Sequence, residues 1–418
     1  MIKNYTLIAA FLLMCFGLKA QEVHKCYAHE LHNNAISNNP DIIKKQNNLE
    51  ALTKDYIKRN ASNRSAGTVL RIPVVVHMVH NGEAIGTGDN LSDALVNFQI
   101  ARLNEDFRKQ NSDTLSSTHP FSSDQADCEI EFCLATVDPS GNPTTGIVRY
   151  NGMRASWDIS SIDNILKPST IWNRYDYLNL WCVNLVDPAS PGVDGYATFP
   201  SSTTDTTDGV VVASFTFGDD GGNKSIVATH EVGHYLNLLH IWGDNSPNCG
   251  NDSVADTPPA FASNSGCPTF PYSPNDSCGT DANGQMFMNY MDYSDAVCVV
   301  MFTNGQKDRM RATLTTERLS LTQSGACGGT TSLPESVLIN KFTIYPNPST
   351  GSFVVEADLN SEEATNVSIY NSLGKLVKTY NNVSFPFLIN AAELNNGSYF
   401  MRLQTEKNVA TKQFFIAK

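Results

Sequence analysis

The chain has 418 residues, of which 41% are hydrophobic and 17% are charged. This length allows two or three domains with cores of their own, and the composition excludes a disordered chain. The net charge of −13 argues against nucleic acid as a partner and suits a soluble secreted protein, including one that binds calcium.

The first residues have the composition of a cleaved signal peptide. Lys3 precedes an apolar run that ends at Leu18, and the small residue Ala20 follows it. The run is too short to cross a membrane, and no later stretch predicts a transmembrane segment. We therefore assign residues 1–20 to a signal peptide and expect an exported protein whose cysteines can oxidise. Cys15 leaves with this peptide, so nine cysteines remain and at least one thiol is unpaired.

Residues 21–64 are polar and rich in Asn and Lys, with weak helical periodicity at 42–57. They end in a basic stretch of the kind that proteases favour, so we interpret them as a propeptide removed after Arg59 or Arg64. An ordinary N-terminal extension is the alternative.

Cys26 lies in this segment, and a thiolate is a strong zinc ligand. Cys26 is therefore a candidate zinc ligand that keeps the enzyme latent. The alternative is a free or mispaired thiol in a flexible N-terminal tail.

Three histidines form the main chemical motif. His230 and His234 lie four positions apart, so at about 100° per residue both imidazoles occupy one helix face and can bind one zinc ion. His240 reaches the same metal only if the helix ends between them, and Asn237 tolerates the left-handed turn that this requires. Three histidines leave the fourth zinc position for water, as in a catalytic site. Glu231 is placed to take the proton of that water.

Elements of a mixed sheet precede this motif. The pattern predicts a strand, a helix, three further strands and the zinc helix, at Ile72–Val79, Leu91–Phe107, Ile130–Val137, Tyr177–Val186, Val210–Phe217 and from about Ser225. Such an order is typical of a mixed α/β layer. We expect a substrate strand to pair with an exposed sheet edge, for which Val210–Phe217 is the candidate.

The chain after His240 is irregular, and long irregular segments within a domain are functional or held by cross-links. Its four cysteines allow three pairings, and their spacing does not choose among them: Cys249, Cys267, Cys278 and Cys298. Asp244, Asp252 and Asp256 offer the oxygen ligands that calcium prefers. Solvated acidic loops are the alternative interpretation of these aspartates.

The C-terminal part has a different composition. Residues 331–341 are interpreted as a linker after a catalytic domain at 65–330. Short alternating runs then follow to residue 418, separated by turn pairs such as Asn396-Gly397. Residues 342–418 are therefore predicted to form a small all-β sandwich of roughly seven strands.

The central domain resembles a known peptidase family. The motif from His230 to His240, followed by Asn-Tyr-Met-Asp-Tyr at 289–293, is similar to that of metzincin metallopeptidases. Within that clan, residues from about 70 to 328 resemble the pappalysin family. The resemblance implies an α/β (α+β) metzincin-like domain with a mixed sheet, in which Met291 forms the Met-turn under the zinc histidines. It also implies that Tyr293 hydrogen-bonds the oxyanion during turnover.

The same resemblance carries further expectations for cross-links and cofactors. It implies the disulfides Cys249–Cys278 and Cys267–Cys298, bound calcium in addition to one catalytic zinc, and a latency role for Cys26 in a zymogen. Asn237 stands where the clan has glycine, a difference that its tolerance of a left-handed turn permits.

The C-terminal tail resembles the sorting domains of the type IX secretion system. The stretches that carry the likeness are 344–351, 394–399 and the closing 412–418. This implies the type IX machinery as a partner, passage across an outer membrane, and release or surface attachment after the tail is cleaved. A carbohydrate-binding or adhesive sandwich is the alternative.

The sequence thus predicts a secreted zinc endopeptidase that hydrolyses peptide bonds in proteins through a zinc-bound water activated by Glu231. One alternative is a cell-surface adhesin with a structural zinc site, which would have no need of Glu231. Another is a zinc hydrolase acting on a non-peptide amide or ester.

Overall fold

The computed structural model describes residues 26–60, 67–218, 225–244, 249–274, 278, 283–328, 342–357, 365–371, 376–404 and 409–418. The chain divides into two compact units, residues 1–329 and 330–418. The predicted signal peptide and linker lie outside the described residues, as does the end of the predicted propeptide at residue 64. The assigned boundaries of these segments therefore stay predictions. No helix among the described residues combines the length and apolarity needed to cross a membrane.

The described chain begins with two helices, α1 (Ala28–Asn38) and α2 (Asp41–Asn60). The weak periodicity at 42–57 thus corresponds to a helix of 20 residues. Its buried side chains, Ile42, Leu49 and Thr53, recur at helical spacing and form one face. That helix packs against α7 (Asn304–Leu314) of the same unit.

The centre of the first unit is a mixed sheet in the order β2-β1-β4-β6-β5, with β3 also paired to β1. Its strands are β1 (Leu70–His80), β2 (Ile130–Leu134), β3 (Ile147–Asn151), β4 (Leu178–Val183), β5 (Gly195–Ala197) and β6 (Val210–Ala213). The first half of β1 pairs with β2 and its second half with β3. All pairings are parallel except that of β5 with β6.

The edge strand of this sheet is β5, so the prediction that Val210–Phe217 forms the exposed edge was wrong. Strand β6 lies between β4 and β5. It also ends at Ala213, because the next residues turn into the short 3-10 helix η4 (Ser214–Thr216). A strand as short as β5 carries too few side chains to produce an alternating pattern in the sequence.

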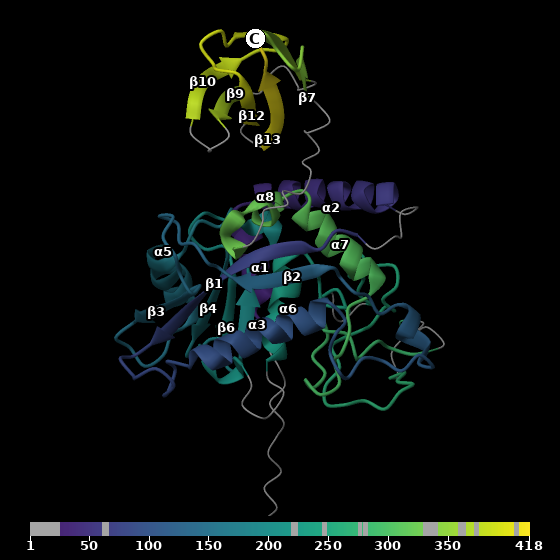
Figure 1. Cartoon of the computed structure of the whole chain (residues 1–418). Coiled ribbons are helices and arrows are strands. Elements are labelled where there is room, and N and C mark those ends of the chain that lie inside the picture. The colour runs from purple at the N-terminus through teal and green to yellow at the C-terminus, as the bar shows by residue number, and fades with distance from the viewer. Residues whose placement is uncertain are drawn as a thin grey trace, which may run out of the picture. The chain divides into compact units, whose positions relative to one another are not determined.

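The two faces of the sheet bury alternate side chains of β1. Val74 and Val76 point to a core shared with α3 (Asp93–Phe107) and α6 (Ile226–Tyr235), whereas Val75 points to the opposite face. The helix α3 begins where Ser92 accepts a hydrogen bond from the Leu95 amide. Figure 1 shows α3 and α6 beside the strands. The strands thus provide a rigid layer against which α6 is held.

The remaining elements of the first unit are short helical segments, apart from α7. They are η1 (Pro120–Ser123), α4 (Ile159–Ser161), η2 (Ile162–Leu166), α5 (Lys167–Thr170), η3 (Pro200–Ser202), α8 (Leu319–Gln323) and η5 (Gly325–Cys327). The start of α7 is fixed by a capping box between Thr303 and Gln306.

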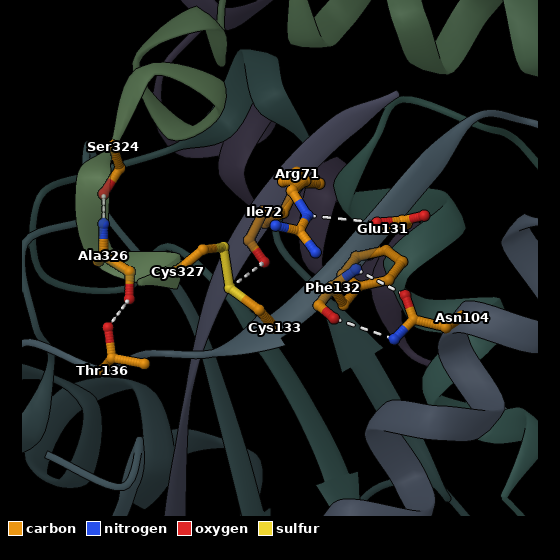
Figure 2. Close-up of a disulfide and its surroundings, with 10 residues drawn as sticks. All are labelled: Arg71, Ile72, Asn104, Glu131, Phe132, Cys133, Thr136, Ser324, Ala326 and Cys327. Atoms are coloured by element: carbon orange, nitrogen blue, oxygen red, sulfur yellow. Dashed lines mark hydrogen bonds and ion pairs between the residues drawn. A yellow bond between two sulfur atoms is a disulfide. The ribbon is translucent and has the colours of Figure 1, made fainter. Parts of the chain in front are cut away.

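A disulfide fastens the end of the first unit to its sheet. Cys327 in η5 is bonded to Cys133 in β2 (Figure 2). Beside it, the Thr136 hydroxyl and amide both donate to the Ala326 carbonyl, at 3.0 and 2.7 Å. The disulfide thus anchors the C-terminal end of this unit on β2.

The second unit is all β. It contains two antiparallel sheets, β10-β9-β12-β13 and β11-β8-β7. The strands are β7 (Phe342–Tyr345), β8 (Ser352–Ala357), β9 (Thr365–Asn371), β10 (Leu376–Val383), β11 (Phe387–Asn390), β12 (Gly397–Gln404) and β13 (Val409–Ile416). Side chains from both sheets, such as Phe353 and Phe414, share one core. The predicted sandwich is confirmed.

Candidate active site

The helix α6 carries the histidine motif through the interior of the first unit. All ten of its residues are buried. It ends in a Schellman turn, in which the Leu238 amide donates to Gly233 O and the Asn237 amide to His234 O, both at 2.9 Å. Asn237 has a φ of 76°, the left-handed conformation expected from the sequence. The turn reverses the chain and brings His240 back toward α6.

The three histidines converge on one point. The Nε2 atoms of His230 and His234 are 3.1 Å apart, and each lies 3.1–3.2 Å from Nε2 of His240. Their other ring nitrogens face acceptors at 2.6–2.8 Å, which are Tyr290 O, Leu238 O and Asp244 Oδ1 respectively. Each Nδ1 therefore carries the proton, and three Nε2 lone pairs face one another. This donor set fits a zinc ion, which takes three histidine nitrogens in catalytic sites.

Glu231 and Cys26 lie beside these histidines. The Cys26 thiol donates to Glu231 Oε2 at 3.3 Å, and its Sγ belongs to a buried group with the three histidine nitrogens, all within 4.8 Å of one another. Burial and the nearby Glu231 raise the pKa of the Cys26 thiol, and burial raises the pKa of the Glu231 carboxyl. A cation at this point would favour the thiolate, so Cys26 fits the fourth position of the same metal.

The backbone around Cys26 occupies the edge of the sheet. Cys26 forms a parallel bridge with Gly195 in β5, and the Tyr27 amide donates to Gly195 O at 3.1 Å. The Tyr293 hydroxyl contacts the same segment, since it accepts from the Cys26 amide at 3.3 Å and lies 3.4 Å from Cys26 O. The N-terminal segment therefore covers both the metal site and the strand beside it.

Met291 and Tyr293 complete the site from a loop about fifty residues further on. Met291 is fully buried, and a Cβ added to Gly233 would lie 2.5 Å from its Sδ, so it packs directly on α6. The Tyr293 ring lies 4.9 Å from the His240 ring and 4.8 Å from that of Trp242, which stacks on His240. The structure thus brings together the residues predicted as metal ligands, base, floor and oxyanion donor.

A buried carboxylate supports these residues, and the sequence interpretation missed its role. Asp106 in α3 accepts from the Thr229 hydroxyl at 2.6 Å and from the Tyr290 hydroxyl at 2.8 Å, and it pairs with Arg102. Thr229 precedes His230, whose Nδ1 donates to Tyr290 O. Burial raises the Asp106 pKa to about 6, although Arg102 opposes this. Asp106 therefore fastens α6 to the loop that forms the floor.

The aspartates predicted to bind calcium lie in separate surroundings. Asp244 accepts from His240 and faces His29 at 3.4 Å. The Asp252 carboxylate accepts from the Thr257 hydroxyl, and that of Asp256 accepts from the Thr303 hydroxyl and the Gly305 amide, all at 2.7–2.9 Å. In the part of the chain that the structure describes, these three do not form a common metal-binding group. Calcium stays a prediction.

Cross-links hold the irregular loop between the two halves of the site. The disulfides Cys249–Cys278 and Cys267–Cys298 are the pairs that the family resemblance implies. With the disulfide to Cys327, they leave three free cysteines among the described residues, Cys26, Cys128 and Cys182, all buried.

Comparisons with known proteins agree with this geometry. The model of the pregnancy-associated plasma protein-A family matches residues 161–315, and that of the secretion system C-terminal sorting domain matches residues 343–417. An extracellular metalloprotease of Verticillium alfalfae is 33% identical over 268 residues, which are 62% of this chain and 80% of that protein. One of Arthroderma otae is 34% identical and covers 47% of this chain and 73% of its own.

Solved structures give the same relationship. Mirolysin in complex with a compound is 40% identical, with a TM-score of 0.57, and covers 63% of this chain and 100% of its own. A promirolysin mutant of Tannerella forsythia is 36% identical, with a TM-score of 0.61, and covers 72% of this chain and 97% of its own.

Proposed function

This chain belongs to the pregnancy-associated plasma protein-A (pappalysin) family of metallopeptidases, and from that premise we propose how its own residues cut peptide bonds. It is a secreted zinc metalloendopeptidase with a C-terminal secretion sorting domain. The observation that carries the proposal is the convergence of three histidine Nε2 atoms, 3.1–3.2 Å apart, beside the buried carboxylate of Glu231.

His230, His234 and His240 hold the zinc ion, and their Nδ1 partners keep the rings oriented. Zinc supplies a Lewis acid that acidifies water and polarises a carbonyl. Glu231 takes the proton from the attacking water and gives it to the leaving amine. Burial raises the pKa of this carboxyl, which favours its taking up the proton of the water.

Tyr293 is the proposed donor to the developing oxyanion, since its hydroxyl contacts the backbone of Cys26, whose thiol lies beside the three histidines. We expect Tyr293→Phe to lower kcat by about 10²-fold, because one preorganised donor is lost while the ring contacts with His240 and Trp242 remain. Steady-state assays on a quenched peptide should show KM nearly unchanged, and metal analysis should show wild-type zinc. An unchanged kcat would remove Tyr293 from the mechanism.

The substrate strand is proposed to pair with β5, the edge strand of the sheet. The Gly195 carbonyl in β5 already accepts a hydrogen bond from the Tyr27 amide, and Gly195 forms a β-bridge with Cys26. This edge can therefore pair with an extended peptide next to the metal site. Main-chain pairing of this kind favours a peptide over a small ester or amide. It therefore supports proteins and peptides as substrates.

Residues 21–64 are proposed to be a propeptide that keeps the enzyme latent through Cys26. The support is that Cys26 reaches the histidines and Glu231 while its backbone lies along β5. A thiolate in the fourth zinc position would exclude water, and the segment would block the substrate edge at the same time.

The test is Cys26→Ala in the full-length chain. We expect cleavage of a quenched peptide by the uncut protein, and faster appearance of the mature form on gels, because water can enter the fourth metal position. Cys128→Ala is the matched control, since Cys128 is also a buried free thiol but lies outside the site. Equal maturation of wild type and Cys26→Ala would contradict latency through this cysteine.

Two further assignments are kept as proposals. Calcium binding by Asp244, Asp252 or Asp256 would staple the loop that follows the zinc helix. The type IX machinery is proposed to recognise residues 342–418, with support from the match to the sorting-domain model. Removal of this tail would then release the enzyme or attach it to the surface.

A further inference from the structure

Arg309 in α7 connects the N-terminal segment to the turn that places His240. Its Nε donates to Asn237 O at 2.6 Å. On its other side, Nη1 donates to Glu50 Oε2 at 2.9 Å, and Nη2 donates to Glu50 Oε1. The Arg309 side chain is only 3% exposed and that of Glu50 is 23% exposed, so the arginine is shielded from water and its partner partly so. Both carboxylate oxygens are engaged, which is the strongest geometry for such a pair.

Arg318 provides an internal comparison for this arrangement. Its Nε donates to Tyr235 O at 2.9 Å, so two arginines hold backbone carbonyls at the end of α6. Arg318 also pairs through both nitrogens with Asp208, at 2.7 and 2.9 Å. The counter-ion of Arg318 is Asp208, which lies just before β6 of the sheet. The counter-ion of Arg309 is Glu50, which lies in α2, within the proposed propeptide.

The surroundings of Arg309 offer no second carboxylate at ion-pair distance among the described residues. Asp252 is near enough that the charge of Arg309 lowers its pKa, although burial raises that pKa overall, to about 7. The Asp252 carboxylate is engaged by Thr257 and by the Val254 amide. Loss of Glu50 would therefore leave the outward N–H groups of Arg309 without their bidentate partner.

We propose that Arg309 is a positioning residue for His240, acting through Asn237, and that its outward N–H groups are the docking point for Glu50 of the propeptide. The propeptide is then held at two separate places, by Cys26 at the metal and by Glu50 at the turn. This inference rests on the proposed latency. Breaking a shielded bidentate pair by removing one partner weakens the closed state independently of the metal.

The test compares maturation rates of full-length variants on gels, together with peptide cleavage by the uncut protein. We expect Glu50→Gln to speed maturation about tenfold, the effect of losing one charge-assisted contact of about 1.4 kcal/mol. Asp55→Asn is the matched control, because it removes the same charge from α2, and Asp55 forms its ion pair with Arg59 of the same helix. The double variant Cys26→Ala/Glu50→Gln should mature faster than either single variant.

The outcomes separate the two proposals. If Cys26→Ala speeds maturation but Glu50→Gln matures no faster than Asp55→Asn, the docking point is wrong and latency through Cys26 stands. If Cys26→Ala has no effect, the proposed latency itself fails.

The positioning role needs its own readout on mature enzyme. Mature protein from Glu50→Gln should have wild-type kcat and zinc retention, because Glu50 has been removed. Mature Arg309→Ala should lose zinc to a chelator severalfold faster, and Arg309→Lys should restore part of that retention. Wild-type zinc loss from a folded Arg309→Ala enzyme, checked by its melting curve, would overturn the positioning role.

Discussion

Glu231→Gln is expected to lower kcat by about 10³- to 10⁴-fold while zinc content stays at the wild-type level. The amide has the shape of the carboxylate but cannot take a proton from water, so only the transfer is removed. Glu231 is neither one of the proposed zinc ligands nor a hydrogen-bond partner of their Nδ1 atoms, so the metal should remain bound. Peptide cleavage by the mature variant gives kcat, and metal analysis by mass spectrometry gives the zinc content.

Glu105→Gln is the matched control for this experiment, since Glu105 is an exposed glutamate on α3. It should leave kcat unchanged. Cleavage by Glu231→Gln within tenfold of wild type would exclude Glu231 as the base. Loss of zinc together with activity would instead assign it a structural role.

Asn237→Val is expected to lower zinc occupancy and to reduce activity by about 10²-fold, whereas Asn237→Gly should behave as wild type. Asn237 has a φ of 76°, which a β-branched residue adopts only with strain and glycine adopts freely. A shift of this turn would displace His240, and a misplacement of about 1 Å among catalytic groups can lower activity by about 10²-fold.

Glycine is also the appropriate control because Asn237 Nδ2 has no hydrogen-bond partner among the described residues, so its removal loses no bond. Zinc content and kcat would be measured at several free zinc concentrations. If the valine variant binds zinc as tightly as wild type, the turn does not control the position of His240.

The part of the site that could be predicted from sequence is the local part. The spacing of His230, His234 and His240 specifies one helix face and one turn, and Asn237 is the residue type that the turn requires. Met291 and Tyr293 could be assigned only through the family resemblance. Their approach to the metal depends on the path of a cross-linked loop, which spacing along the chain does not encode.

Other supports of the site were missed because their partners lie far away in the chain. Arg309 and Arg318 contact carbonyls 72 and 83 positions earlier, and Asp106 contacts a hydroxyl 123 positions later. Charged residues are seldom buried without a partner, so a sequence offers no reason to place them inside until that partner is known. Strand β5 was missed for a different reason, since three residues are too few to show alternation.

The bond between Cys133 and Cys327 determines how far the peptidase can be trimmed from its carboxyl end. An exopeptidase that enters after removal of the sorting domain would meet a residue fastened to β2, with Ala326 held by Thr136 just before it. Digestion should therefore stall at Cys327 under oxidising conditions and pass it only after reduction. The enzyme would in this way keep a defined last residue.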